Sequence, residues 1–223
     1  MTRVPYQAEL QRLQHAVHDE PRAVSRQLAP VREALESGDR AIADEVIERD
    51  GEVESLYAEL QADLVTVIAR QAPVASDLRL ITALLHVSRM IERMGDQCVN
   101  VAKLLTVAGP SPDGTEEFHG CLLMMCRATE EAIEAAATTL CDEDLDAARA
   151  LEEGDTVVNE LNRSCFARAI ELGDAHERRA WATAMILVAR AFERIADNAV
   201  DIGAHMRFAV TGTFESRPAT PAA

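Results

Sequence analysis

Residues 89–101 read RMIERMGDQCVNV, and residues 190–202 read RAFERIADNAVDI. The two segments carry Arg, Glu, Arg, Asp and Val in the same register, 101 residues apart. A step of four returns to nearly the same face of an α-helix, so each segment predicts a helix with three oxygen-bearing side chains in a row. These rows are Glu92, Asp96 and Asn100 in the first segment and Glu193, Asp197 and Asp201 in the second.

The sequence around the two segments predicts two helical halves built on one plan. Apolar residues recur at helical spacing from Ile42 to Val67, from Leu78 to Leu105, and again through the second half. The stretch AGPSPDGT at residues 108–115 has the Pro, Gly and Ser content of a linker. We expect an all-α fold of six long helices, in two tandem pseudo-symmetric three-helix bundles resembling spectrin repeats, over residues 6–107 and 116–212. Residues 213–223 lack periodicity and predict a disordered tail.

Local signals refine the helix boundaries. Pro21 and Pro30 are expected to kink or split the first helix, and Asp19 could cap a restart there. The apolar pattern from Ile42 onward predicts one middle helix of roughly 30 residues. In the second half, Asp174 is expected to cap the last helix, with Glu177 as its capping-box partner.

Composition limits the class of protein and its partners. Hydrophobic residues make up 48% of the 223 residues and aromatic residues only 4%, which is typical of a helical bundle. The net charge of −16 argues against nucleic acid and anionic lipid as direct partners. No apolar stretch is long enough for a membrane span, and the N-terminus does not resemble a signal peptide, so we expect a cytoplasmic protein with no membrane insertion. Five cysteines without CxxC spacing indicate small core residues.

Acidic residues on the middle helices and on the helices that follow them form candidate cation sites. Antiparallel packing would bring their faces together as an oxygen-only cage, which suits Mg²⁺, Mn²⁺ or iron. Because like carboxylates at i,i+4 repel, a bound metal or nearby Arg must offset the repulsion. The alternative is a solvated face paired with Arg89, Arg93, Arg190 and Arg194. The candidate sets are Asp50, Glu54, Glu92, Asp96 and Asn100 in the first half, and Asp155, Asn159, Glu193, Asp197 and Asp201 in the second.

The sequence gives no positive sign of an enzyme. It lacks GxSxG, GxxxxGK[ST], GxGxxG and HExxH motifs. A di-iron carboxylate bundle needs two Glu-x-x-His motifs on different helices, and only Glu116-x-x-His119 occurs, beside the linker. We predict no catalytic residues. A carboxylate-bridged di-metal enzyme and a metal-free structural bundle remain the alternatives.

Two longer segments resemble the signature of the PhoU phosphate-signalling family. QAPVASDLRLITALLHVSRMIERMGDQCVNVAK (71–103) is similar to its Gln-x-Pro-Val-Ala-x-Asp-Leu-Arg start and its Glu-Arg-Ile-Gly-Asp-His-x-x-Asn core. ARAFERIADNAVDIGAHMRFAVTG (189–212) is similar to the second copy, including the terminal Val-Thr-Gly. The resemblance runs from about residue 6 to residue 212.

The resemblance implies a negative regulator of phosphate uptake and of the phosphate-starvation response. Family members link the phosphate ABC transporter, through its ATPase subunit, to a sensor histidine kinase. Many form homodimers, and some hold metal clusters on their acidic faces. It therefore implies a divalent metal, with Fe, Mn, Zn and Mg all open, on the acidic sets given above.

Several positions depart from the family pattern. Gln97 and Asn198 stand where the family often has His, and Glu54 and Asn159 stand where it often has Asp. The second half has GDAHERRAW in place of the Pro-Val-Ala-x-Asp-Leu-Arg loop. These departures leave the fold unchanged and alter the set of metal ligands, most of all in the second half, where Asn159 is uncharged.

Overall fold

The computed structural model describes residues 3–142, 145–172 and 176–214. These residues form helices and connecting turns, with no β-strand among them, so the predicted all-α class is confirmed. The helices are α1 (Arg3–Ser37), α2 (Arg40–Glu48), α3 (Glu52–Gln71), α4 (Ala75–Ala108), α5 (Glu116–Asp142), α6 (Leu145–Glu171) and α7 (His176–Thr211).

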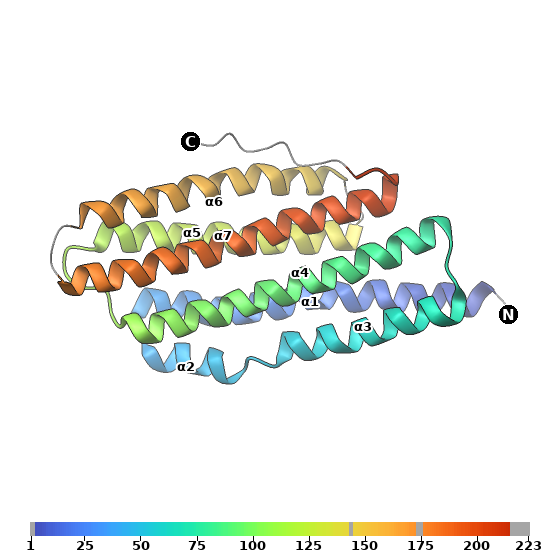
Figure 1. Ribbon diagram of the computed structural model, residues 1–223, viewed down its shortest axis with the longest axis horizontal. Coiled ribbons are helices and arrows are strands. Elements are labelled where there is room, and N and C mark those ends of the chain that lie inside the picture. Colours follow the sequence, from blue (N-terminus) through green and yellow to red (C-terminus); the bar gives the residue numbers. More distant parts are fainter. Residues whose placement is uncertain (1–2, 143–144, 173–175, 215–223) are drawn as a thin grey trace.

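The helices form two groups that share one long interface. Helix α1 packs against α2, α3 and α4, whereas α5, α6 and α7 pack against one another. The groups meet where α4 lies antiparallel to α7 and where α1 lies against α5 (Figure 1). The junction also carries charge pairs, because Arg32 of α1 contacts Glu130 of α5 at 2.9 Å and Arg127 of α5 contacts Glu36 of α1 at 3.6 Å. No helix in the described part of the chain is long and apolar enough to cross a membrane.

Helix α1 runs through both of its prolines, so the predicted split of the first helix is wrong. Pro21 and its neighbours Val24 and Leu28 are buried, because α1 packs against helices of both groups. This packing outweighs the two backbone hydrogen bonds that the prolines cannot make. Asp19 lies inside the helix and pairs with Arg22 at 3.0 Å instead of capping a restart.

The middle helix of the first half is interrupted, which corrects the prediction of one helix of roughly 30 residues. Helix α2 ends at Glu48 and α3 begins at Glu52. The backbone N–H of Asp50 bonds to the carbonyl of Ile47 at 3.4 Å, and the N–H of Ser55 bonds to the carbonyl of Gly51 at 3.0 Å. An Asp-Gly pair favours a turn, and here it overrides the apolar periodicity. Helix α6, which takes the same place in the second half, continues without such a turn.

Other boundaries agree with the sequence. Helix α3 ends at Gln71 with Ala72 in the left-handed conformation, and the connection from Gly109 to Thr115 separates α4 from α5. The apolar residues at helical spacing in the last helix, which the sequence places in the core, are buried in α7 at Trp181, Met185, Val188, Phe192, Ile195 and Ile202. Leu78 was expected in the core but is 43% exposed, because it lies in the first turn of α4 at one end of the molecule. The predicted cap Asp174 and residues 215–223 of the predicted tail lie outside the described residues.

Four of the five cysteines are buried free thiols, as the sequence predicts. Cys121 of α5 and Cys165 of α6 bring their sulfur atoms to 3.3 Å. Burial raises the pKa of the Cys98 thiol to about 12, so this group stays protonated at neutral pH. The side chain of Cys141 lies outside the described residues.

Candidate cation-binding face

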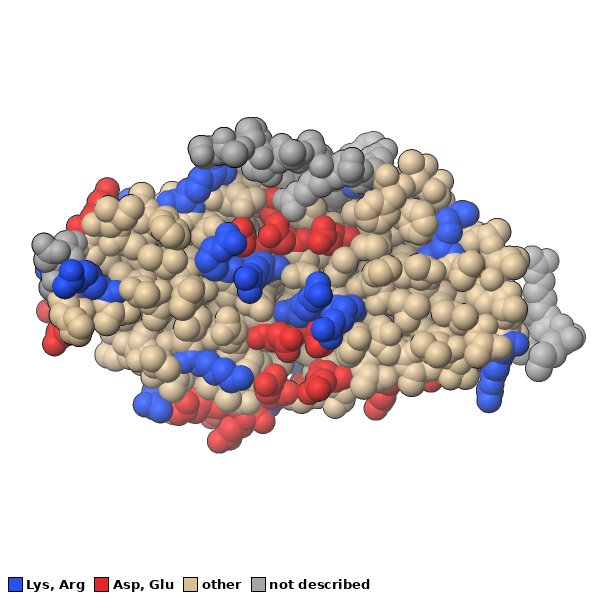
Figure 2. Space-filling model, viewed as in Figure 1, with Lys and Arg blue, Asp and Glu red and all other residues tan. Residues whose placement is uncertain are grey.

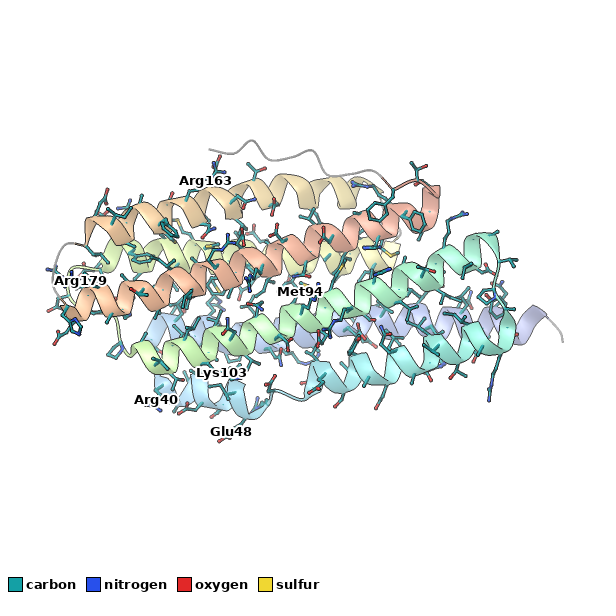
Figure 3. The ribbon with its side chains drawn as sticks, viewed as in Figure 1. Arg40, Glu48, Met94, Lys103, Arg163 and Arg179 are labelled. Carbon is teal, nitrogen blue, oxygen red and sulfur yellow. The ribbon has the colours of Figure 1, made fainter. Side chains whose placement is uncertain are left out.

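The candidate residues gather where α4 and α7 lie side by side. We call this surface the central face, and define it by Arg89, Glu92, Arg93 and Asp96 of α4 and Arg190, Glu193, Arg194 and Asp197 of α7. Figure 2 shows acidic side chains on both sides of a group of basic side chains in the middle of this side of the molecule. Met94, which Figure 3 labels at the middle of α4, is fully buried and anchors this part of the helix in the core.

In the first half, the acidic residues meet across α3 and α4. Burial raises the pKa of the half-buried Glu92 carboxyl, and Asp96 and Glu54 raise it further, whereas Arg89 and Arg93 lower it. Arg89 Nη1 donates to Glu92 Oε1 at 2.7 Å. The other oxygen, Glu92 Oε2, is buried without a hydrogen-bond partner among the described residues. Glu54 is thus the middle-helix carboxylate whose charge acts on Glu92.

The remaining first-half candidates lie outside this group. Asp50 is exposed in the turn between α2 and α3, so the prediction that it marks a point on the middle helix is wrong. The turn that breaks the helix removes Asp50 from the face that carries Glu54. Asn100 is exposed one turn beyond Asp96.

In the second half, the corresponding group is more deeply buried. Asp155 of α6 is 5% exposed and Glu193 of α7 is 9% exposed. Burial is the main cause that raises the pKa of Glu193, and the charges of Asp197 and Asp155 raise it further. The charge of Arg190 lowers it. Helix α6 is unbroken and buries Asp155 against the rest of its group, whereas Glu54 of α3 stays exposed at the surface.

Asn159 and Arg190 hold the second group together. Asn159 Nδ2 donates to Asp155 Oδ2 at 2.8 Å, and Arg190 Nη1 donates to Glu193 Oε1 at 2.7 Å. Asn159 therefore contacts the candidate group, as the sequence predicts, but presents its amide N–H₂ instead of an oxygen. Asp201 is exposed, one turn past Asp197.

The two sequence-based explanations of the acidic rows stand differently against this geometry. Arg89 and Arg190 pair with Glu92 and Glu193 three residues on, which is the arginine alternative. In the part of the chain that the structure describes, no three His, Cys, Asp or Glu side chains converge closely enough to hold a metal ion. The two groups nevertheless offer only oxygen donors, with Glu92 Oε2 unbonded, and this donor set fits a hard or borderline cation.

The glycine of the first motif allows the helices to approach closely. A Cβ on Gly95 would lie 3.1 Å from Gln27 Oε1 of α1 and 3.2 Å from Val53 of α3. Because glycine has no Cβ, α4 can pack closely against α1 and α3 at Gly95, next to the acidic residues. The second motif has Ala196 at this place, where α7 accepts a methyl group.

The isolated Glu116-x-x-His119 motif is engaged elsewhere. Glu116 Oε1 accepts a hydrogen bond from the backbone N–H of Gly114 at 3.0 Å, which closes the start of α5. A ring nitrogen of His119 lies 2.7 Å from the carbonyl oxygen of Leu35. Glu116 thus stabilises the start of α5, and His119 stabilises the junction between α1 and α5.

Sequence analysis missed one buried carboxyl, that of Glu20. It is 2% exposed, and neither of its oxygens has a hydrogen-bond partner among the described residues. Burial raises its pKa from 4.5 to about 8. The signal was present, because Glu20 lies within the apolar stripe formed by Leu13, Val17, Val24, Leu28 and Val31.

Comparisons with known proteins agree on one family. The PhoU domain model matches residues 21–105 and 122–206. The chain is 30% identical over 182 residues to "Phosphate-specific transport system accessory protein PhoU homolog 2" of Mycobacterium tuberculosis, covering 82% of this chain and 85% of the relative. It is 30% identical over 193 residues to the Deinococcus radiodurans protein named "Phosphate-specific transport system accessory protein PhoU homolog", covering 86% and 90%.

Solved structures share the fold. The phosphate transport system regulatory protein PhoU from Streptococcus pneumoniae superposes with a TM-score of 0.86 at 19% identity, over 95% of this chain and all of that one. PhoU from Pseudomonas aeruginosa gives 0.84 at 24% identity, over 93% of this chain and all of that one.

Proposed function

The chain belongs to the PhoU family, and we propose that it is a negative regulator of phosphate uptake and of the phosphate-starvation response. The supporting observation is that relatives 30% identical over most of both chains are named accessory proteins of phosphate-specific transport systems. The family and these names point to a regulator associated with phosphate transport and away from an enzyme.

The proposed mechanism is binding. A cytoplasmic adaptor would dock on the ATPase subunit of the phosphate transporter and on the sensor histidine kinase, and would act as a homodimer. The net charge of −16 favours basic partner surfaces and fast, salt-sensitive encounter. The long seam between α4 and α7 holds the two helix groups together, so a partner would meet both as one surface.

We further propose that the central face, together with the neighbouring carboxylates of α3 and α6, binds divalent cations, with Fe, Mn, Zn and Mg as candidates. Glu54, Glu92 and Asp96 would hold one in the first half, and Asp155, Glu193 and Asp197 one in the second. Burial and neighbouring carboxylates raise the pKa of Glu92 and of Glu193, so the charged forms of both carry a free-energy cost. A bound cation would offset that cost. Asn100 and Asp201, each one turn further along its helix, and Asp50 in the turn before α3 would contribute at most through water.

Elemental analysis of protein purified without chelator tests the cation sites. We expect one or more metal ions per chain, lost in the Asp96→Ala, Asp197→Ala double variant with helicity retained. The matched control, Glu131→Ala with Glu134→Ala, removes the same charge from exposed positions on α5 and should keep the metal. Unchanged metal content in the first double variant would refute the assignment. A metal-free, folded wild type would instead favour the metal-free bundle, whose acidic rows pair with arginine.

The regulatory role needs a separate measurement. Deleting the gene should raise phosphate uptake and switch on a phosphate-starvation reporter at high phosphate, and the wild-type gene should reverse both. Purified protein should bind the transporter's ATPase subunit with an affinity that falls as salt rises. Unaltered uptake and reporter output in the deletion strain would overturn the proposed role whatever the metal content.

A further inference from the structure

Two histidines face each other across the seam between the helix groups, away from the acidic groups. His86 of α4 and His205 of α7 have ring centroids 4.7 Å apart and ring planes only 20° apart. His86 is exposed and His205 is half-buried. The ring of Phe214 also packs on His205, with the two ring centroids 5.2 Å apart. The pair therefore joins one side chain from each helix group at a position that solvent reaches.

The nitrogen atoms of this pair are available to a ligand. Neither ring makes a hydrogen bond or an ion pair with another of the described residues, unlike His119, which bonds to a backbone carbonyl. Burial, and then the neighbouring His86, lower the pKa of His205 to about 4, so its ring is neutral at pH 7. Neutral imidazole is the form that coordinates metal ions.

The internal repeat shows that the fold does not require histidine here. With the offset of 101 residues between the two motifs, Leu187 is the second-half equivalent of His86, and Leu104 is the first-half equivalent of His205. Helices α4 and α7 run antiparallel, so Leu104 and Leu187 occupy the matching place toward the other end of the same seam (Figure 1). The repeat-equivalent positions are thus leucine toward one end of the seam and histidine toward the other.

We propose that His86 and His205 form a binding site for a divalent transition-metal ion that bridges α4 and α7. Imidazole nitrogen suits Zn²⁺, Ni²⁺ and Cu²⁺, whereas the oxygen-only central face suits harder cations. The stacked rings direct their in-plane nitrogen lone pairs alongside each other, so both side chains must turn about χ2, a broad torsion in histidine, before one nitrogen of each points at a shared ion. No third His, Cys, Asp or Glu joins them among the described residues, so water completes the coordination and the ion exchanges readily.

A bound ion would act as a clamp. Its ligands come from helices 119 residues apart in the sequence, so it binds only while α4 and α7 are packed together. Metal that binds the folded chain and not the unfolded chain raises the unfolding temperature. The site would make the stability of the seam depend on transition-metal concentration.

The test uses the full chain without a histidine tag, titrated with Zn²⁺ and with Ni²⁺ by calorimetry and followed by thermal unfolding. In the Asp96→Ala, Asp197→Ala background, which removes the proposed cation sites on the acidic groups, we expect saturable binding of one ion per chain and a rise in unfolding temperature. The variant His86→Leu with His205→Leu, which copies the pair at the other end of the seam, should fold and lose both effects. If that variant does not fold, His86→Gln alone, at an exposed position, should lower affinity at least tenfold.

Two controls separate this site from others. His15→Ala with His18→Ala removes a second histidine pair, 5.7 Å apart on α1, and should leave the seam site intact. Asp96→Ala with Asp197→Ala should also keep it, which makes the outcome independent of the cation sites on the central face. Absence of saturable Zn²⁺ or Ni²⁺ binding, or binding that survives His86→Gln and the double leucine change, would overturn the proposal.

Discussion

The buried carboxyl of Glu20 should make the stability of this protein fall as pH rises. In the folded chain its pKa is about 8, against 4.5 for an ordinary glutamate, because it is shielded from water and no described residue bonds to it. The folded state therefore holds this proton up to about pH 8, whereas the unfolded chain releases it near pH 4.5. Because the folded pKa lies above the unfolded one, the contribution of Glu20 to the free energy of unfolding is fully present below pH 4.5 and is lost as the pH rises from there to about 8.

The size of the effect follows from the shift. Each pKa unit corresponds to about 1.4 kcal/mol, so at pH 7 the burial of Glu20 lowers the free energy of unfolding by about 3 kcal/mol relative to acid conditions. Glu20→Gln keeps the shape of the protonated side chain and cannot ionise. The variant should be more stable than wild type at pH 7, with an advantage that grows by about 1.4 kcal/mol per pH unit from pH 5 to pH 8 and then levels off.

Denaturant unfolding of both proteins at half-unit steps from pH 5 to pH 9 measures this difference directly. Contributions from the histidines cancel, because they are common to both chains. Glu33→Gln, on the exposed side of the same helix, provides the control and should leave the pH dependence unchanged. A difference between wild type and Glu20→Gln that stays constant across this range would refute the assignment of a protonated, unpaired carboxyl.

Gly95→Ala, with Gly154→Ala as its control, and Asn159→Asp test the packing and the charge around the central face. Gly95→Ala should lower the free energy of unfolding by about 1 kcal/mol, since crowding against Gln27 and Val53 exceeds the gain in helix propensity. At Gly154 an added Cβ meets open space, so Gly154→Ala should raise the free energy of unfolding by about 0.5 kcal/mol in the same denaturant titration. Asn159→Asp adds a third carboxylate beside Asp155 and Glu193, and should lower the unfolding temperature without metal and restore it with Mn²⁺ in thermal scans. If Gly95→Ala stabilises the chain, or Mn²⁺ has no larger effect on Asn159→Asp than on wild type, the corresponding reasoning fails.

The sequence predicted the elements with long, regular periodicity. The stripe from Trp181 to Ile202 and the ends of α3 and α4 follow from local chemistry: apolar spacing, the proline after Ala72 and the Gly-Pro pair after α4. The same reasoning failed where two local signals competed. At Asp50-Gly51 the turn prevailed over periodicity, and at Pro21 packing prevailed over the helix-breaking proline.

The candidate site divides in the same way. Spacing by four determined that Glu92 and Asp96, and likewise Glu193 and Asp197, share a helix face, because that relation lies within one helix. Which residue of the middle helix reaches them depends on how two helices pack, and only the structure selects Glu54 and excludes Asp50. The sequence predicted ion pairing between Arg89 and Glu92 as an alternative. It did not predict the distance between them or the burial of Glu193.

By itself the sequence therefore determined the all-α class, the doubled plan and the family, since these rest on local periodicity and on motifs read along one helix. The tertiary structure alone decided the burial of Glu20, the stacking of His86 on His205 and the close approach at Gly95. Each of these depends on contacts between residues distant in the chain, and their free energies arise from desolvation and packing that no local pattern encodes.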